Sequence, residues 1–497
     1  NYWHLISDML EYGQPIGYMG FYGTHAPVGT FGFHGFVILL PYYLFARIFG
    51  LHFYTLAVCN MVLVSLGLLF YIRMLRPSVK NMLLTGGLIT LPSMVSKFYS
   101  TSMLEGLNVF LAIVFGVLFI KILDTGKRRW KVAAWAVMAF AALEKVTWVI
   151  CVLPLAMVCL KGTIRRRAGW TAGIMAAVSL TGYKIYSLFS APYYQSKFND
   201  FRDTFAQEGV LKGALIMARE TFYDFFRPML IALRGQDGEG SLEVLNGILL
   251  YGLFLILTVM VIRLIWMWFR HREDFWVYTA FSRRQVVLTA AAWTVMAADL
   301  AGIAVLYMPA QTIRTAFHSY LFALVLLSEW EQPAAKPGED RRPGEEAGRT
   351  GKRLSGAVSG FRLAFLALSA ASTVVLCVTG EGFGDKLYIS EEFLEEYDET
   401  RAFLSQYIQL DTSQVGWRNT VAYMEGVPEI YWMCMPAGTG LNYHVWLSDS
   451  YEEQWAIMEI VQDGVYDFDT VYTSFTGAGY EEIARDDRII LFEKTDD

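Results

Sequence analysis

Four ionisable residues stand next to, or inside, apolar stretches where they could transfer a proton or bind an anion. Glu144 and Lys145 interrupt a stretch that is otherwise apolar from 132 to 160. Glu105 stands at the start of one apolar run, and Arg314 directly precedes another. Ionisable groups at membrane depth are costly and are usually kept for function. Each also has an ordinary interpretation: a local pair at a turn for Glu144 and Lys145, a helix-start carboxylate for Glu105 and a snorkelling side chain for Arg314.

The first segment of the chain holds three further candidates. His4, Asp8 and His25 lie among aromatic and glycine residues in the first 30 positions. An imidazole could contact a phosphate, and a carboxylate could accept a proton or hold a metal ion. The ordinary interpretation makes the two histidines loop residues and Asp8 part of a solvated face. His34 and His318 are interpreted as packing residues.

The elements that carry these residues place the chain in a membrane. Of its 497 residues, 55% are hydrophobic and 18% are charged, whereas soluble proteins hold about 25% charged residues. The apolar excess is concentrated in runs such as 245–268 and 285–307, which are long enough to cross a bilayer. This composition excludes a soluble enzyme and a nucleic-acid-binding protein, and it makes the lipid bilayer a partner.

Basic residues between the apolar runs predict the topology. Cytoplasmic loops collect Lys and Arg, so we expect five basic clusters inside, at 73–80, 127–131, 165–167, 270–284 and 336–353. The result is an α-helical polytopic membrane protein with about ten spans and both ends of the chain outside. The segment 33–49 is predicted to be an interfacial helix, because a crossing there would invert every later loop.

The same rule decides where Glu144 and Lys145 lie. A single crossing over 132–160 would carry the basic cluster 165–167 to the outside, so we expect two short helices that turn at Glu144 and Lys145. Each arm is about 18–21 Å long, less than the roughly 30 Å of hydrocarbon. The turn is therefore expected below the outer surface, facing a cavity.

The charge balance predicts two domains. Residues 381–497 hold 25 acidic and 6 basic residues, whereas the rest of the chain is basic. We expect a transmembrane domain at 1–379, with outer loops 1–52 and 188–244 and a cytoplasmic linker at 329–360, and a small soluble α/β domain at 380–497 outside the membrane. In that domain, apolar patterns predict strands at 416–424, 471–474 and 488–493 and helices at 391–408 and 450–461.

A series of short motifs follows the same order as in a known class of membrane enzymes. They are Met9-Leu10-Glu11-Tyr12-Gly13, His25-Ala26-Pro27-Val28, Phe49-Gly50, Ser102-Met103-Leu104-Glu105, Ala142-Leu143-Glu144-Lys145 with Leu153-Pro154-Leu155, and Ile313-Arg314. Their order resembles the polyprenyl-phosphate-dependent glycosyltransferases of the GT-C class. Family thirty-nine, with the protein mannosyltransferases and aminoarabinose transferases, is the most similar.

The resemblance implies a GT-C-like transmembrane fold and a glycosyltransferase of the cell envelope. Such an enzyme moves a sugar from a polyprenyl-phosphate carrier to a glycan, lipid or protein acceptor on the outer face. We predict catalytic carboxylates at Glu105 and Asp8, and substrate binding by Lys145, Arg314, His25, Glu144 and His4. Metal dependence varies across the class, so a divalent ion stays open and no other cofactor is assigned.

Two departures from the family pattern matter. The family's Asp-Glu pair would fall just before Asn1, and the chain does not begin with Met, so we expect the main acidic residues upstream. His25 stands where the family often has Lys. Two other functions stay open: a lipid or polysaccharide transporter, which predicts paired repeats and broken helices, and a non-enzymatic scaffold, in which the buried carboxylates and cations are dispensable.

Overall fold

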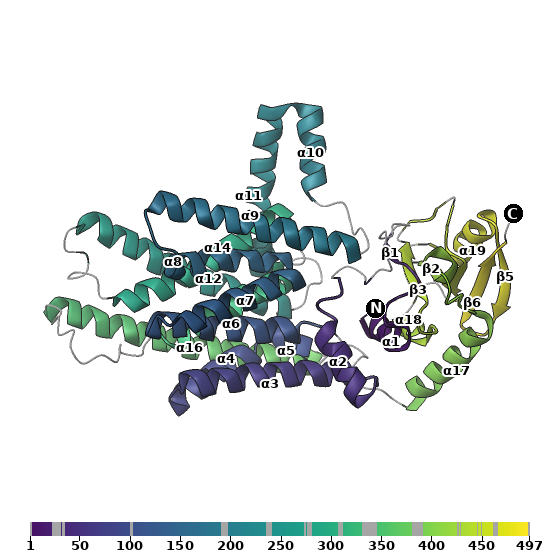
Figure 1. The fold of residues 1–497 in the computed structure, drawn as a ribbon, viewed down its shortest axis with the longest axis horizontal. Coiled ribbons are helices and arrows are strands. Elements are labelled where there is room, and N and C mark those ends of the chain that lie inside the picture. Colours follow the sequence, from purple (N-terminus) through teal and green to yellow (C-terminus); the bar gives the residue numbers. More distant parts are fainter. Residues whose placement is uncertain are drawn as a thin grey trace.

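The structure, a computed structural model, consists of a long helical bundle with a small mixed α/β domain at one end (Figure 1). It describes residues 2–495 apart from 22–30, 32–34, 100–102, 190–196, 235–240, 273–274, 276–280, 307–311, 331–344, 380–390, 425–426, 428, 445, 449 and 461–465. We call the end of the bundle that faces this domain the domain end and the other end the far end.

The bundle follows the predicted apolar runs closely. Its elements are α3 (Thr55–Leu75), α4 (Val79–Thr90), α5 (Ser93–Tyr99), α6 (Gly106–Thr125), α7 (Arg128–Glu144), the 3-10 helix η1 (Val146–Cys151), α8 (Val152–Cys159), α9 (Ile164–Phe189), α12 (Ser241–Arg270), α14 (Arg283–Leu306), α15 (Thr312–Ser328) and α16 (Glu345–Thr379). The short helix α2 (Leu40–Phe49) takes the place expected for the interfacial helix.

Length and composition make this an integral membrane protein. Among the described residues, five helices are long and apolar enough to cross a bilayer: α3, α6, α12, α14 and α16. Shorter apolar helices cover 146–159 and 315–328. The helical membrane fold with a small C-terminal α/β domain, predicted from the sequence, is confirmed.

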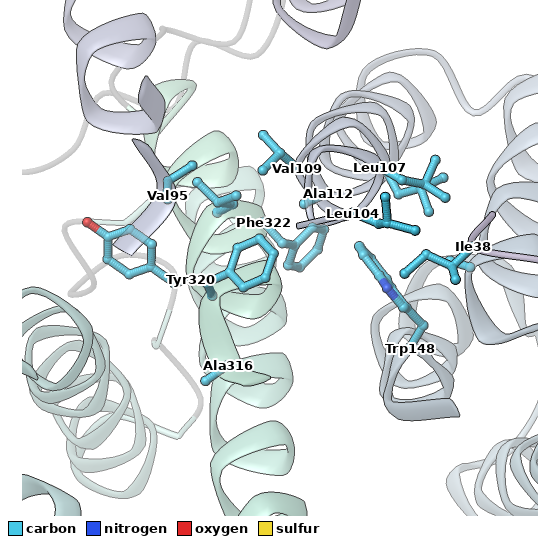
Figure 2. Close-up of a cluster of buried hydrophobic side chains, with 14 of the residues drawn as sticks. Ile38, Val95, Leu104, Leu107, Val109, Ala112, Trp148, Ala316, Tyr320 and Phe322 are labelled. Carbon is cyan, nitrogen blue, oxygen red and sulfur yellow. The ribbon is translucent and has the colours of Figure 1, made fainter. Parts of the chain in front are cut away.

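Helix α6 forms the centre of the bundle, because large apolar side chains surround it on all sides. In its 18-residue apolar window, 83% of the residues are buried. Phe115 of α6 packs on Phe322 of α15, with ring centroids 5.2 Å apart. Figure 2 shows part of this core, in which Trp148 lies near Leu107 of α6 and Leu104 just before that helix. A rigid centre of this kind can hold polar side chains in fixed positions.

The C-terminal domain is built on a six-stranded sheet of order β1-β3-β2-β4-β6-β5. Strands β2 (Thr420–Met424), β3 (Gly440–His444) and β4 (Trp455–Glu459) are parallel, and β6 (Ile489–Lys494) and β5 (Tyr480–Arg485) continue the sheet antiparallel. Helices α17 (Glu391–Tyr407), α18 (Glu429–Cys434) and α19 (Phe468–Gly477) complete the domain.

The sheet takes its edge strand from the other end of the chain. β1 (Met19–Phe21) pairs in parallel with β3, so that Met19 lies opposite Leu441. The preceding helix α1 (Tyr2–Tyr12) also packs beside the sheet domain (Figure 1). Part of the expected outer loop 1–52 therefore belongs to the fold of the small domain.

Two predicted elements of the small domain were wrong. The strand expected at 471–474 lies inside helix α19, because Asp467 caps the helix start and Val471 and Phe475 bury one helical face. The helix expected at 450–461 contains strand β4, whose apolar residues are buried on both faces and so show no alternation. The expected linker 329–360 is helical from Glu345 onward.

The expected outer loop 188–244 is also largely helical. α10 (Lys197–Glu208) and α11 (Val210–Arg234) form a helical hairpin that projects from the side of the bundle (Figure 1). α11 then returns to pack on α12 and α14.

Candidate functional site

Two buried carboxylates meet at the domain end of α6. The amide nitrogen of Asn108 donates to Glu105 Oε2 at 2.9 Å and to Glu144 Oε1 at 3.0 Å. The indole nitrogen of Trp148 donates to Asn108 Oδ1 at 2.8 Å, which fixes the orientation of the amide. All four side chains are buried. We call Glu105, Asn108, Glu144 and Trp148 the carboxylate cluster.

A backbone brace positions Glu105 at the start of α6. Tyr42 of α2 donates to the carbonyl oxygen of Leu104 at 2.9 Å, and Asn60 of α3 donates to that of Met103 at 2.5 Å. Gly106 must be glycine here, since an added Cβ would lie 2.4 Å from Asn60 Oδ1. The N-terminus of α6 is thereby held against α2 and α3, and its dipole favours a negative charge at Glu105.

Glu144 and Lys145 lie where the chain leaves α7. The helix ends at Glu144, Lys145 is extended with φ −145° and ψ 116°, and η1 follows at once. This break places Glu144 inside the bundle, whereas Lys145 is half-buried. The turn predicted from the basic clusters therefore occurs at these two residues, and η1 and α8 pack back on α7.

A second ionisable pair stands beside the cluster. His318 of α15 stacks on the ring of Trp148, with centroids 4.7 Å apart, and its Nε2 lies 3.6 Å from Asp299 Oδ2 on α14. Both side chains are fully buried. The ammonium of Lys145 acts electrostatically on Glu144, Asp299 and His318, so all four belong to one charged neighbourhood.

The sequence interpretation missed part of this neighbourhood. His318 was interpreted as packing, and Asp299, Asn108 and Trp148 were not considered. Asp299 had a usable signal, because it is the only acidic residue inside the apolar run 285–307 and charges in such runs are functional candidates. Asn108 carries no charge and gave no signal of its own.

Several polar atoms of this neighbourhood have no hydrogen-bond partner among the residues that the structure describes. They are Glu144 Oε2, together with Asp299 Oδ2 and His318 Nε2, which lie 3.6 Å from each other, beyond hydrogen-bond distance. A buried polar atom without a partner costs about 1–3 kcal/mol. Such a cost is tolerated where a ligand supplies the missing partner. The arrangement can accept a proton at Glu144, and it can hold an anion beside Lys145.

His4 and Asp8 lie elsewhere, between α1 and the small domain. His4 Nε2 donates to the carbonyl oxygen of Thr439 at 2.6 Å, and the backbone N–H of Gly438 donates to Asp8 Oδ1 at 2.6 Å. The two side chains are 3.5 Å apart. Asp8 was expected on a solvated face, and this is wrong: its side chain is only 1% exposed. Both residues fasten α1 to the turn before β3.

Burial sets the protonation of this pair. Loss of solvent lowers the pKa of His4 to about 4, although the Thr439 carbonyl opposes the change. The same loss of solvent raises the pKa of Asp8 well above its usual range, against the Gly438 N–H. Both groups are therefore held in their neutral forms, and neither lies in the carboxylate cluster.

Three of the other histidines and cations considered in the sequence have side chains outside the described part of the structure. Arg314 lies in the first turn of α15, but its side chain is outside the described part of the structure. His25 and His34 lie outside the described residues as well. Among the described residues, no group of three or more His, Cys, Asp or Glu side chains stands close enough to hold a metal ion.

The chain is similar to two solved structures of ArnT from Cupriavidus metallidurans, one bound to undecaprenyl phosphate and one in the apo state. Each is 13% identical, with a TM-score of 0.45 over 99% of this chain and 92% of ArnT. ArnT is an aminoarabinose transferase of the GT-C class, the class that the sequence motifs resemble. A similarity of this degree carries no weight in assigning a function. No protein-family profile matches the chain, and neither does any curated protein.

Proposed function

We propose that this protein is a membrane glycosyltransferase that moves a sugar from a polyprenyl-phosphate carrier to an acceptor on the outer face of the membrane. The observation that carries the proposal is the carboxylate cluster with the Lys145 ammonium beside it at the domain end of the bundle. The arrangement of basic clusters supports an outer position for that end. The motif order supports the same class of reaction.

The proposed reaction uses each charged group once. The acceptor hydroxyl attacks the anomeric carbon of the sugar, and the bond between that carbon and the phosphate oxygen breaks. The hydroxyl proton passes to Glu144 Oε2, which has no other partner in the described structure. Negative charge grows on the departing phosphate, and Lys145 stabilises it. No step is assigned to a metal ion.

Glu105 and Asn108 act by positioning in this scheme. Asn108 donates one N–H to each carboxylate, so it keeps both acceptor groups at a fixed separation. Two buried carboxylates repel each other unless a proton or a cation lies between them. Lys145 and the acceptor proton supply that compensation during the reaction. Asp299 and His318 extend the polar surface on the α14 and α15 side.

The test is transfer of radiolabelled sugar from polyprenyl phosphate by the full-length protein in membranes. Glu144→Gln keeps the amide contact to Asn108 but removes the base, and we expect a loss of about a hundredfold or more. Glu329→Gln is the matched control, because Glu329 is a buried carboxylate near the far end of the bundle. It should leave transfer per folded molecule unchanged.

Two results would contradict the proposal. Equal transfer by Glu144→Gln and the wild-type protein would remove Glu144 as the base. Efflux of the lipid-linked sugar across the membrane without transfer to any acceptor would favour the transporter.

A further inference from the structure

The hairpin of α10 and α11 has an apolar face that nothing in the described structure covers. The two helices pack closely, since a Cβ added at Gly213 would lie 3.0 Å from Phe205. Lys212 forms an ion pair with Glu208 across the turn between them. The side of α11 away from α10 exposes Leu211 by 80%, Leu215 by 67% and Phe222 by 68%.

The spacing of these residues is that of an amphipathic helix. Leu211, Leu215, Ala218 and Phe222 follow one another at intervals of three or four, so they share one face. Lys212, Arg219 and Glu220 are exposed on the adjoining side. α11 spans 25 residues, and Lys212, Arg219, Glu220, Asp224 and Arg227 distribute charge along it, which is costly in a helix that crosses a membrane. Its composition is that of a helix that lies at a boundary between lipid and water.

The placement of the hairpin agrees with such a boundary. In Figure 1 the hairpin runs across the direction of the bundle helices and leaves the bundle toward its domain end. Because the bundle helices cross the bilayer, a hairpin across them lies along the membrane plane. It follows α9, whose Leu180 and Tyr183 near the same end are also exposed. The apolar surface of α11 therefore continues a surface that already faces lipid.

We propose that the α10–α11 hairpin binds the membrane surface at the domain end of the bundle, with the apolar face of α11 among the acyl chains of that leaflet. Lys212, Arg219 and Glu220 then face the headgroups and water. The hairpin thereby anchors the protein laterally in this leaflet, next to the N-terminus of α12. This inference does not depend on the proposed transferase activity.

The test compares spin labels on the two faces of α11 in full-length protein reconstituted in phospholipid nanodiscs. Cys377 and Cys159 are replaced by Ser, since the other three cysteines are buried. Single labels are placed by Leu215→Cys and Phe222→Cys on the apolar face, by Glu220→Cys on the opposite side of the helix and by Lys212→Cys at the boundary between them. Collision rates with oxygen, which concentrates in lipid, and with a water-soluble nickel chelate are measured at each site.

We expect the ratio of oxygen to nickel collisions to be several-fold higher at 215 and 222 than at 220, with an intermediate value at 212. Equal ratios on the two faces, with nickel collisions dominant, would place the hairpin in water and overturn the inference. Low collision rates with both reagents at 215 and 222 would show a protein contact and would overturn it too. If that contact is made by a second copy of this protein, nanodiscs that hold a single copy would remove it, and collision rates at 215 and 222 would rise.

Discussion

The two ends of the bundle each hold a polar network, largely buried, and they differ in how completely their atoms are paired. At the far end, Tyr71 contacts Glu329 at 3.4 Å, Arg362 donates to Thr85 at 3.2 Å, and Arg284 pairs with Asp124 at 2.9 Å. At the domain end, Glu144, Asp299 and His318 each keep an atom without a hydrogen bond in the described structure. A paired network stabilises the fold, whereas an unpaired one is ready for a ligand.

The largest effect on turnover is expected from substitution of Lys145, at the domain end. Lys145→Ala removes the cation that is proposed to stabilise the leaving phosphate. We expect a loss of about 2.7–4 kcal/mol in transition-state stabilisation, or a hundred- to thousandfold in turnover, by analogy with a lost oxyanion-hole donor. Lys145→Arg should restore only part of the rate, because a planar guanidinium does not replace a compact ammonium. Turnover of radiolabelled sugar checks both variants.

Thermal melting of the same variants tests the other interpretation of Lys145. If its role is to neutralise Glu144 and hold the turn, Lys145→Ala should lose its melting transition together with its turnover. Wild-type turnover in Lys145→Ala would remove the phosphate role.

At the far end, the expected effect is on stability. Arg362→Met removes the guanidinium that donates to Thr85 and Asn81 while keeping an unbranched side chain. Losing hydrogen bonds to a charged group costs roughly 1.5–3 kcal/mol. We expect a lower melting temperature and unchanged turnover per folded molecule. A fall in turnover with an unchanged melting temperature would show that the comparison between the ends is wrong.

The sequence predicted the bundle well because spans and basic clusters are local signals. The turn at Glu144 and Lys145 follows from the basic clusters on both sides of 132–160 and from the two charges inside that run, and the break after α7 occurs there. The strand β1 could not be predicted, because its partner β3 lies more than 400 residues away and three residues carry little pattern. Asp8 looked solvated for the same reason: its partner Gly438 is on a distant turn.

The site was predictable only where a charge marked it. Glu105, Glu144 and Lys145 were predicted because they are charged residues next to apolar runs. Asn108 and Trp148 complete the hydrogen bonds, but an amide and an indole within apolar helices do not stand out from packing residues. A role of that kind depends on which helices become neighbours, and the sequence of one chain does not specify this.

A smaller effect is expected from the indole that orients the cluster. Trp148→Phe keeps a ring against His318 but removes the N–H that donates to Asn108 Oδ1. The loss of one buried hydrogen bond amounts to about 0.5–1.5 kcal/mol, so turnover should fall about tenfold or less. Trp330→Phe is the matched control, since the Trp330 indole donates to Thr289 near the far end. An equal loss of turnover in both variants would contradict a positioning role for Trp148.

The smallest net effect concerns pH and the contact between α1 and the small domain. Because burial lowers the pKa of His4 from its usual 6.5 to about 4, its contribution to stability is complete above pH 6.5 and is lost as the pH falls toward 4. Burial raises the pKa of Asp8 above its usual 3.8, so its contribution is complete below that value and is lost as the pH rises. The two changes oppose each other in the wild-type protein.

Single variants should therefore diverge where the wild-type protein changes little. Each melting temperature is expressed as its difference from that of the double variant His4→Gln/Asp8→Asn at the same pH. On acidification from pH 7 to pH 4.5, these differences should rise for His4→Gln, in which only Asp8 of the pair titrates. They should fall for Asp8→Asn, in which only His4 titrates. Because the double variant keeps every other titrating group of the chain, subtracting its melting temperature removes the contribution of those groups. Parallel curves for the two single variants would mean that burial does not shift the two pKa values in opposite directions, and the neutral assignment of this contact would be wrong.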